Sequence, residues 1–514
     1  MAAISATPER TTIGGTIEIP RIINGLWQLA GGHDKQVDRD TAVKAMNSLI
    51  DSGLSCFDMA DHYGDAELVI GEYNTSNPSG SRITAFTKWC PQENGNRSFE
   101  RAKEAVDLAL SRMKQTSIAL MQYHAWDYTD PTYLCNLAHL AVMQEDGKIQ
   151  AIGLTNIDAA HLELLLHSGY RIATNQVSCS VIDQRLVKGR LSLVCAEHDV
   201  GVLAYGTLLG GFLSEKWLAV PEPTNEQELN WSLRKYLRFI RAAGGWAPFQ
   251  GVLQALSQVA TRHSVPIAAV ATRWVLDVPV VRAVIVGSRL NAECDKYTSG
   301  NLSAFSFKLD DEDLSLISRA QEKLKDIPGD CGDEYRRSPF LTASGDLSHH
   351  IRGEIDQRAA SDVAAGNRLE YGTGTNWERI AGYSRAVRVR DTIRVSGTTA
   401  NPPRGLVNPP PAMGGSCSRC QTTAILGTIA SAVRHLGGTM ADVVRTRIMI
   451  RDEKDCQEVS EAHAWVFGCE NVRPANTLTT AGLIGEACLV EIEAEAVVGS
   501  GSSVVRYNEA RIGP

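Results

Sequence analysis

The sequence lacks the features of a secreted or membrane-spanning chain. Its N-terminus, MAAISATPERTTIGGTIEIP, contains no apolar leader segment, and no run of about 18 apolar residues follows it. It also lacks an excess of positive charge, since the formal net charge is -8. Proteins that bind nucleic acids or anionic membranes rely on clustered Lys and Arg. We therefore expect a cytoplasmic protein that binds small molecules, with no nucleic-acid or membrane partner.

Closely spaced cysteines are scarce as well. The chain has 12 cysteines, and they are scattered along its length. The one tight pair, Cys417 and Cys420 in GGSCSRCQ, lacks a second pair at the spacing of a zinc site. We therefore predict free thiols and no metal.

The first 300 or so residues repeat one pattern, in which a short apolar run is followed by an amphipathic helical stretch. The eight apolar runs are RIINGLW, LSCFDMA, RITAFTKW, SIALMQYHA, QAIGLTN, ATNQVSCS, VGVLAYG and AVIVGS. Eight βα units predict a parallel (β/α)8 barrel, known as a TIM barrel. A doubly wound sheet is the alternative, but no GxGxxG follows the first run. The long insertion from Ser214 to Phe249 is a candidate lid over the active site.

The composition and periodicity of the sequence change after the eight βα units. Residues 326–366 are polar, rich in Gly and Ser, and without sustained periodicity, which predicts a linker. From residue 367 onward, strand patterns alternate with helices such as CQTTAILGTIASAVRHLGG, and DTIRVSG follows the preceding run through a hairpin-like turn. We therefore predict a barrel domain over 1–325, a linker over 326–366, and a smaller α+β domain with an antiparallel or mixed sheet over 367–514.

Four polar residues stand at or just beyond the ends of three predicted barrel strands. Asp58 and Tyr63 follow the second strand, Lys88 ends the third, and His124 ends the fourth. In a parallel barrel these ends face one mouth, where active sites form. A phenol gives up its proton poorly at neutral pH unless a cation stabilises phenolate character, and Lys88 could supply that cation while Asp58 holds it in place. His124 could hydrogen-bond a substrate oxygen or share the proton with Tyr63.

These residues lie in motifs that together resemble the aldo-keto reductase superfamily. The motifs are FDMADHYGDAE, TKW, the YH of MQYHAW, IGLTN, NQVSCS and LAYGTLLGGFL. The resemblance implies a TIM barrel that binds a nicotinamide dinucleotide, with Asp58, Tyr63, Lys88 and His124 as catalytic tetrad and Tyr63 as general acid. It also implies a set of cofactor-binding residues. These are Asn156 and Gln176 at the carboxamide, Tyr205 stacked on the nicotinamide, Leu208, Gly210 and Gly211 at the pyrophosphate, and Gly287, Ser288 and Arg289 at the adenosine ribose and its phosphate.

The sequence departs from the family pattern where the adenosine part of the cofactor would bind. Many NADP-dependent members carry basic residues where this sequence has Gly287 and Glu293. Arg289 could compensate. We therefore expect NADPH as the cofactor, with NADH possible.

The second domain resembles the Rid family of reactive-intermediate deaminases. The resemblance is carried by GYSRAVRVRDTIRVSGTTA, CQTTAILGTIASAVRHLGG, DVVRTRIMIRD and VEIEAEAVV. It implies a trimer with clefts between subunits, imine or enamine hydrolysis, and Tyr383 and Glu491 as cleft residues. However, Asn476 stands where imine deaminases have an arginine, and an amide cannot provide the bidentate fork that holds a carboxylate. The domain could therefore hydrolyse imines, or could serve only for trimer formation or binding.

The two resemblances together predict an NAD(P)H-dependent reductase of a carbonyl or imine substrate, fused to a Rid-like domain and assembled as a homotrimer. Two alternatives remain open. One is a sugar or alcohol dehydrogenase that runs in the oxidative direction, and the other is a non-catalytic nucleotide-sensing protein.

Overall fold

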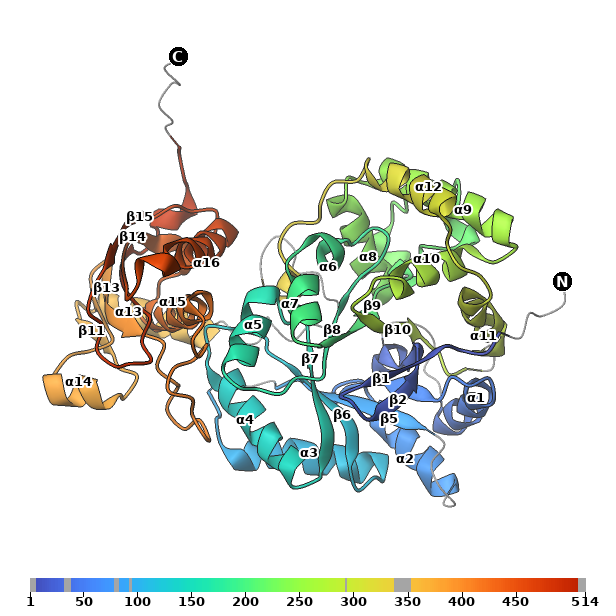
Figure 1. The fold of residues 1–514 in the computed structure, drawn as a ribbon, viewed down its shortest axis with the longest axis horizontal. Helices are drawn as coiled ribbons and strands as arrows, with labels where there is room; N and C mark the ends of the chain where they lie inside the picture. The colour runs from blue at the N-terminus through green and yellow to red at the C-terminus, as the bar shows by residue number, and fades with distance from the viewer. Residues whose placement is uncertain are drawn as a thin grey trace, which may run out of the picture.

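The computed structural model describes residues 6–31, 38–77, 83–91, 95–291, 294–336 and 353–506. Its first part is a closed barrel of eight parallel strands in the order β10-β3-β4-β5-β6-β7-β8-β9 (Figure 1). The strands are β3 (Ile22–Gly25), β4 (Cys56–Asp58), β5 (Thr84–Trp89), β6 (Ile118–His124), β7 (Ile149–Thr155), β8 (Thr174–Ser178), β9 (Gly201–Tyr205) and β10 (Val281–Gly287). Each corresponds to one predicted apolar run, so the predicted TIM barrel is confirmed.

The helices of this first part surround the barrel. They are α1 (Arg39–Asp51), α2 (Ala66–Ser76), α3 (Phe99–Met113), α4 (Thr132–Glu145), α5 (Ala159–His167), α6 (Arg185–Lys188), α7 (Leu191–Glu197), α8 (Trp231–Ala242), α9 (Trp246–His263), α10 (Ile267–Leu276), α11 (Cys294–Leu302) and α12 (Asp311–Gln321). Because helices cover the outer face, barrel strands are buried on both faces, and β3 and β8 are buried along their whole length. Among the described residues, the helices are too short or too polar to cross a bilayer.

An N-terminal hairpin covers one end of the barrel. The strands β1 (Arg10–Ile13) and β2 (Ile17–Pro20) pair antiparallel, and Ile13, Ile17 and Ile19 are buried against barrel residues that include Leu120 and Leu203. Both leucines precede the polar ends of their strands. The hairpin therefore closes the amino end and leaves the opposite mouth for the site.

The second part is an α+β unit with a six-stranded mixed sheet in the order β11-β12-β13-β16-β14-β15. Its strands are β11 (Leu369–Tyr371), β12 (Ala386–Val389), β13 (Thr392–Thr399), β14 (Val443–Ile450), β15 (Ala475–Thr480) and β16 (Val490–Val497), and only β14 and β15 pair in parallel. Its helices are α13 (Gly353–Ala364), α14 (Asn376–Ala381), α15 (Ser418–His435) and α16 (Cys456–Cys469). The predicted hairpin at β12 and β13 is present, and the mixed sheet agrees with the predicted fold.

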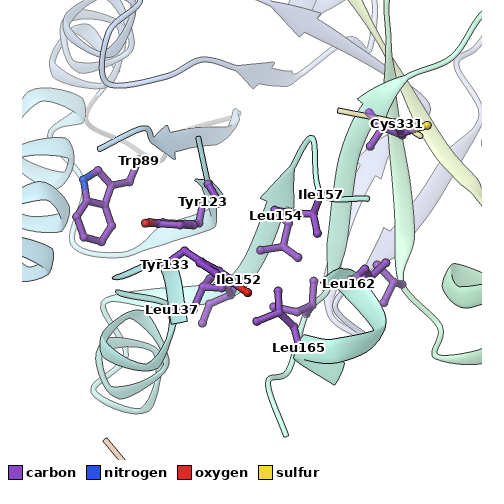
Figure 2. Packing of buried hydrophobic residues seen from close by; sticks show 14 of the residues in the cluster. Trp89, Tyr123, Tyr133, Leu137, Ile152, Leu154, Ile157, Leu162, Leu165 and Cys331 are labelled. Atoms are coloured by element: carbon purple, nitrogen blue, oxygen red, sulfur yellow. The ribbon is translucent and has the colours of Figure 1, made fainter. Parts of the chain in front are cut away.

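The two parts of the chain touch through α15 and α5, which pack against each other (Figure 1). Polar contacts reinforce this interface, since Arg434 of α15 forms an ion pair with Asp127 and donates to Thr129 Oγ1 at 2.9 Å. Figure 2 shows the core beneath α5, where Leu154, Ile157, Leu162 and Leu165 lie close together and Cys331 lies at the edge of the group.

Residues on both sides of the predicted linker's centre are folded. Glu334 accepts from Arg185 at 2.7 Å, and Arg336 donates to the Ala125 and Asn156 carbonyl oxygens, so residues 326–336 lie against the barrel. At the other end, α13 packs on α15 and β11. Residues 337–352 lie outside the described residues. The division into domains therefore stays a prediction, although its linker contains more packed structure than the composition suggested.

We expect Gly332→Ala to loosen the segment that Arg336 anchors. Gly332 has a φ of +91°, and a Cβ there would lie 2.1 Å from the Asn156 carbonyl oxygen. Gly366→Ala is the matched control, because its φ is +82° but nothing lies within 4 Å of the added Cβ. Both variants share the left-handed backbone cost of about 1 kcal/mol. Only Gly332→Ala should lose roughly 2 kcal/mol more, through overpacking. Urea denaturation measures both losses, and equal losses would contradict the close packing of residues 326–336.

Candidate active site

A buried ion pair lies at the carboxyl end of neighbouring barrel strands. Asp58 ends β4 and Lys88 lies next to the end of β5, and parallel pairing brings these ends together. Lys88 Nζ donates to Asp58 Oδ2 at 2.6 Å and to the Met59 carbonyl oxygen at 2.8 Å. The Lys88 ammonium also lies 5.2 Å from the centre of the Tyr63 ring. Three of the four predicted catalytic residues are therefore in direct contact.

Further hydrogen bonds hold the Asp58 carboxylate. Gln122 Nε2 donates to Asp58 Oδ1 at 2.8 Å, and Gln176 Nε2 donates to the same oxygen at 2.9 Å. These bonds matter because a buried charge is costly unless it is paired and hydrogen-bonded. Gln122 was not among the predicted residues. The only signal for it is a polar residue inside the apolar run IALMQYH.

Burial controls the protonation of the two remaining tetrad members. Burial raises the pKa of the Tyr63 phenol well above its usual value, and the negative charge of Asp58 raises it further. This differs from the expectation that Lys88 would favour phenolate character, because desolvation and the negative charges nearby both raise the pKa of the phenol. Burial also lowers the pKa of His124, and Arg336 lowers it further. At neutral pH Tyr63 therefore keeps its proton and His124 is uncharged.

His124 is held by its neighbours on two sides. Its ring stacks on Trp126 with centroids 3.9 Å apart. Its Nε2 lies 3.3 Å from Asn156 Nδ2, and Tyr205 donates its hydroxyl to Asn156 Oδ1 at 2.7 Å. A chain of contacts thus joins the end of β6 to the ends of β7 and β9.

One cavity of about 700 Å³ contains the whole predicted site of the first domain. The four tetrad residues line it together with every predicted cofactor residue, namely Asn156, Gln176, Tyr205, Leu208, Gly210, Gly211, Gly287, Ser288 and Arg289.

The glycine loop after β9 lines the cavity and has a backbone conformation that favours glycine. Gly210 and Gly211 have φ values of +66° and +109°, which favour glycine, and a Cβ on Gly210 would approach Ser232 to 3.0 Å. Gly210 therefore lets the loop pack closely against the start of α8 beside the cavity. With the amides of Asn156 and Gln176 and the ring of Tyr205 in the same cavity, these residues fit a nicotinamide dinucleotide.

Residues 21–322 match the sequence profile of the aldo/keto reductase family, which is more than half of the chain. The chain belongs to the aldo/keto reductase family. Residues 373–498 match a second profile, described as endoribonuclease L-PSP, which corresponds to the Rid proteins. Both predicted resemblances are thereby confirmed.

Individual relatives of the chain are distant. An NADH-specific methylglyoxal reductase of Escherichia coli is 24% identical over 339 residues, which cover 60% of this chain and 97% of that protein. Flagellar radial spoke protein 5 of Chlamydomonas reinhardtii is 36% identical over 138 residues, but the match covers only 26% of each protein. The structure of a glycerol dehydrogenase from Gluconobacter oxydans has a TM-score of 0.49 and 22% identity, covering 64% of this chain and 98% of that one. The family supports an oxidoreductase of carbonyl substrates.

Two residues outside the predicted set enter this aldo/keto reductase cavity. Lys235 of α8 is buried, donates to the Tyr335 hydroxyl at 2.6 Å, and lies 5.0 Å from the centre of the Tyr205 ring. Tyr335 lies 5.4 Å from His124, measured between ring centres. Lys235 shares a helical face with Ser232 and Phe239, which is a weak signal of burial. Tyr335 falls in the predicted linker, where the sequence offers no periodic pattern.

The predicted cleft residues of the Rid-like part are not brought together in one chain. Arg385 donates to the Tyr383 hydroxyl at 3.2 Å and also acts on Glu491, whose pKa is raised by burial and by Glu493 against the opposing charge of Arg385. Asn476 is exposed on the outer strand β15, where its side chain accepts from Thr446 Oγ1 at 3.2 Å. The chain therefore groups Tyr383 and Glu491 around one arginine, and it places Asn476 on β15, two strands away from β16, which carries Glu491.

Breaking the Asp58–Lys88 pair should cost much more stability than breaking an exposed pair of equal length. Asp58→Asn leaves a buried ammonium without its carboxylate, and we expect it to lower the free energy of unfolding by about 3 kcal/mol. Asp326→Asn is the control, because Lys188 Nζ donates to Asp326 Oδ1 at the same 2.6 Å with both side chains exposed. We expect a loss below about 1 kcal/mol there.

Urea denaturation of the single variants and of Asp58→Asn/Lys88→Met would test this expectation. The double variant should recover part of the loss, because no unpaired charge remains. Losses of the same size for Asp58→Asn and Asp326→Asn would show that the buried pair contributes little.

Proposed function

We propose that the barrel is an NAD(P)H-dependent reductase of a carbonyl or imine group. The observation that carries this proposal is the position of the Tyr63 phenol beside the buried Lys88–Asp58 pair, in the cavity that also contains the glycine loop. The nicotinamide cofactor would supply the hydride. The residues of the chain would bind and orient the substrate and deliver the proton.

Tyr63 is the proposed general acid. Its phenol carries a proton at neutral pH, and because burial raises its pKa, donation to the substrate oxygen or nitrogen depends on a nearby cation that stabilises the phenolate. Lys88, at 5.2 Å from the ring centre, would offset the charge left on the phenolate, and Asp58 would fix the position of Lys88. His124 is neutral, so it can hydrogen-bond the substrate without adding charge.

We propose that the barrel prefers NADPH as its cofactor. Asn156 and Gln176 would bind the carboxamide, and the Tyr205 ring would lie against the nicotinamide. Arg289 supports NADPH, since a guanidinium suits the 2'-phosphate that NADH lacks. NADH stays possible, and the E. coli relative is by its name specific for it.

The Rid-like part is proposed to assemble the chain into a trimer. The exposed outer strand β15 and the exposed Ile484 beyond it support an interface on this side of the sheet. We propose a binding or assembly role rather than deamination, because Asn476 cannot hold a carboxylate as arginine would.

Tyr63→Phe should abolish most reduction while leaving cofactor binding intact. The substitution removes the proton donor and keeps the ring, and we expect turnover to fall at least ~100-fold. The measurement is NADPH and NADH titration by fluorescence, followed by a screen of aldehydes and cyclic imines. Tyr133→Phe is the control, since Tyr133 is a buried tyrosine that does not line this cavity.

Near-normal turnover by Tyr63→Phe would rule out the general-acid role. Tight nucleotide binding by the unmodified chain without turnover of any substrate would instead support the sensing alternative.

The full chain should hydrolyse amino-acid-derived imines little faster than buffer does. The assay would use Tyr63→Phe protein, so that reduction does not consume the imine, and would follow keto-acid release. Light scattering on the same sample should report a trimer. Efficient hydrolysis would mean that another group binds the carboxylate, and that the asparagine at position 476 does not abolish deaminase activity. Asn476→Arg is the matched variant, because it restores the arginine of the imine deaminases and would be tested for faster imine hydrolysis.

A further inference from the structure

The Cys417–Cys420 pair meets a histidine of the barrel at the interface between α5 and α15. Cys417 precedes the first residue of α15, Cys420 lies in its first turn, and His167 is the last residue of α5. The Sγ atoms and a ring nitrogen of His167 all lie within 4.8 Å of one another. Cys420 is buried, and the other two are partly buried. The expectation of free thiols rested on the lack of a second cysteine pair, but the fold supplies a ligand from a distant part of the chain.

The backbone around the pair is built for this close approach. Gly414 N donates to Ser168 Oγ at 2.8 Å, which ties the loop before α15 to the residue after His167. A Cβ on Gly415 would lie 2.6 Å from the His167 carbonyl oxygen, so a larger residue would push the loop away. Within the pair, Cys420 N donates to Cys417 Sγ at 3.1 Å. Two glycines and a CxxC turn thus fix both thiols against the end of α5.

The chemistry of this group favours one class of metal. Thiolate sulfur and imidazole nitrogen are the ligands of zinc, whereas calcium and magnesium take oxygen. With Zn–S near 2.3 Å and Zn–N near 2.0 Å, tetrahedral ligand atoms stand about 3.5–4 Å apart, so a side-chain movement of about 1 Å closes the site. Two thiolates would also neutralise the charge of a divalent ion, which suits a partly buried place.

A second imidazole lies close to the same point. The rings of His167 and His198 meet edge to face with centroids 5.3 Å apart. Among the described residues, His198 Nε2 is buried and makes no hydrogen bond. His198 does not belong to the group whose ligand atoms lie within 4.8 Å of one another, so the fourth coordination position falls to water, or to His198 after a movement of its ring.

We propose that His167, Cys417 and Cys420 bind one zinc ion that fastens the Rid-like part of the chain to the barrel. A second group of possible ligands, Asp61, His62 and Cys90, does not carry the same inference. Asp61 already accepts hydrogen bonds from Cys90 N and from His62, and these residues adjoin Tyr63 in the candidate active site. The His167 group has no such part in the proposed reaction.

The test uses the full chain, produced with zinc in the medium and purified under reducing conditions. Elemental analysis should find one zinc per chain with both thiols protected from alkylation. Cys417→Ser and His167→Ala should weaken zinc binding by at least roughly a hundredfold, since loss of an outer-shell partner alone costs 10–100-fold. Competition with a chromophoric chelator measures this change. Cys456→Ser is the matched control, because Cys456 is an exposed cysteine at the start of α16.

A conservative variant guards against misfolding. His167→Cys keeps a zinc ligand at that position and should retain the metal. If His167 only packed against its neighbours, this substitution would not be expected to preserve zinc binding. Cobalt should give the visible absorption of a tetrahedral thiolate site in the wild type and in His167→Cys, and lose it in Cys417→Ser. Chelation should lower the melting temperatures of the wild type, His167→Cys and Cys456→Ser, and leave that of Cys417→Ser unchanged. Reduced wild-type protein that binds no zinc, or binds it equally after Cys417→Ser, would overturn the proposal.

Discussion

One buried carboxylate holds the mouth of the barrel together. Asp58 lies at the end of β4, and its two oxygens accept from Lys88 on β5, Gln122 on β6 and Gln176 on β8. Four of the eight strands therefore meet at one side chain. A charge at this depth is stable only because each bond offsets part of its desolvation. The position of the Lys88 ammonium, and hence its distance from the Tyr63 ring, follows from this network.

A second constraint comes from outside the barrel. Arg336 donates to the Ala125 and Asn156 carbonyl oxygens, and Glu334 is within 3.2 Å of the Tyr205 hydroxyl. Asn156 follows β7, and the chain continues from it into α5, whose far end bears His167 against α15. The same short stretch of chain thus presents an amide to the cavity at one end and contacts the Rid-like part at the other. The packing between the two parts and the shape of the site share this element.

The sequence predicted what depends on local pattern and on the topology rule for parallel barrels. The β-branched runs identified all eight strands, and their polar ends placed Asp58, Lys88 and His124 at one mouth. It could not predict Lys235, Tyr335 or the approach of His167 to Cys417, because each depends on contacts between segments far apart in the chain. It also could not predict that burial would raise the pKa of Tyr63, since the sequence does not show how deeply a ring is enclosed.

Among the described residues, three lysines line the cavity, Lys88, Lys216 and Lys235, and the two buried ones, Lys88 and Lys235, lie in different surroundings. Lys88 is paired with a carboxylate at 2.6 Å, so most of its charge is compensated where it stands. Lys235 donates instead to the Tyr335 phenol and lies about 5 Å from the ring centres of Tyr205 and Tyr335. Aromatic faces attract a cation but do not neutralise it. Lys235 therefore places a positive charge against the ring of Tyr205, which lines the same cavity, whereas the charge of Lys88 is compensated by Asp58 and acts mainly on the Tyr63 phenol beside it.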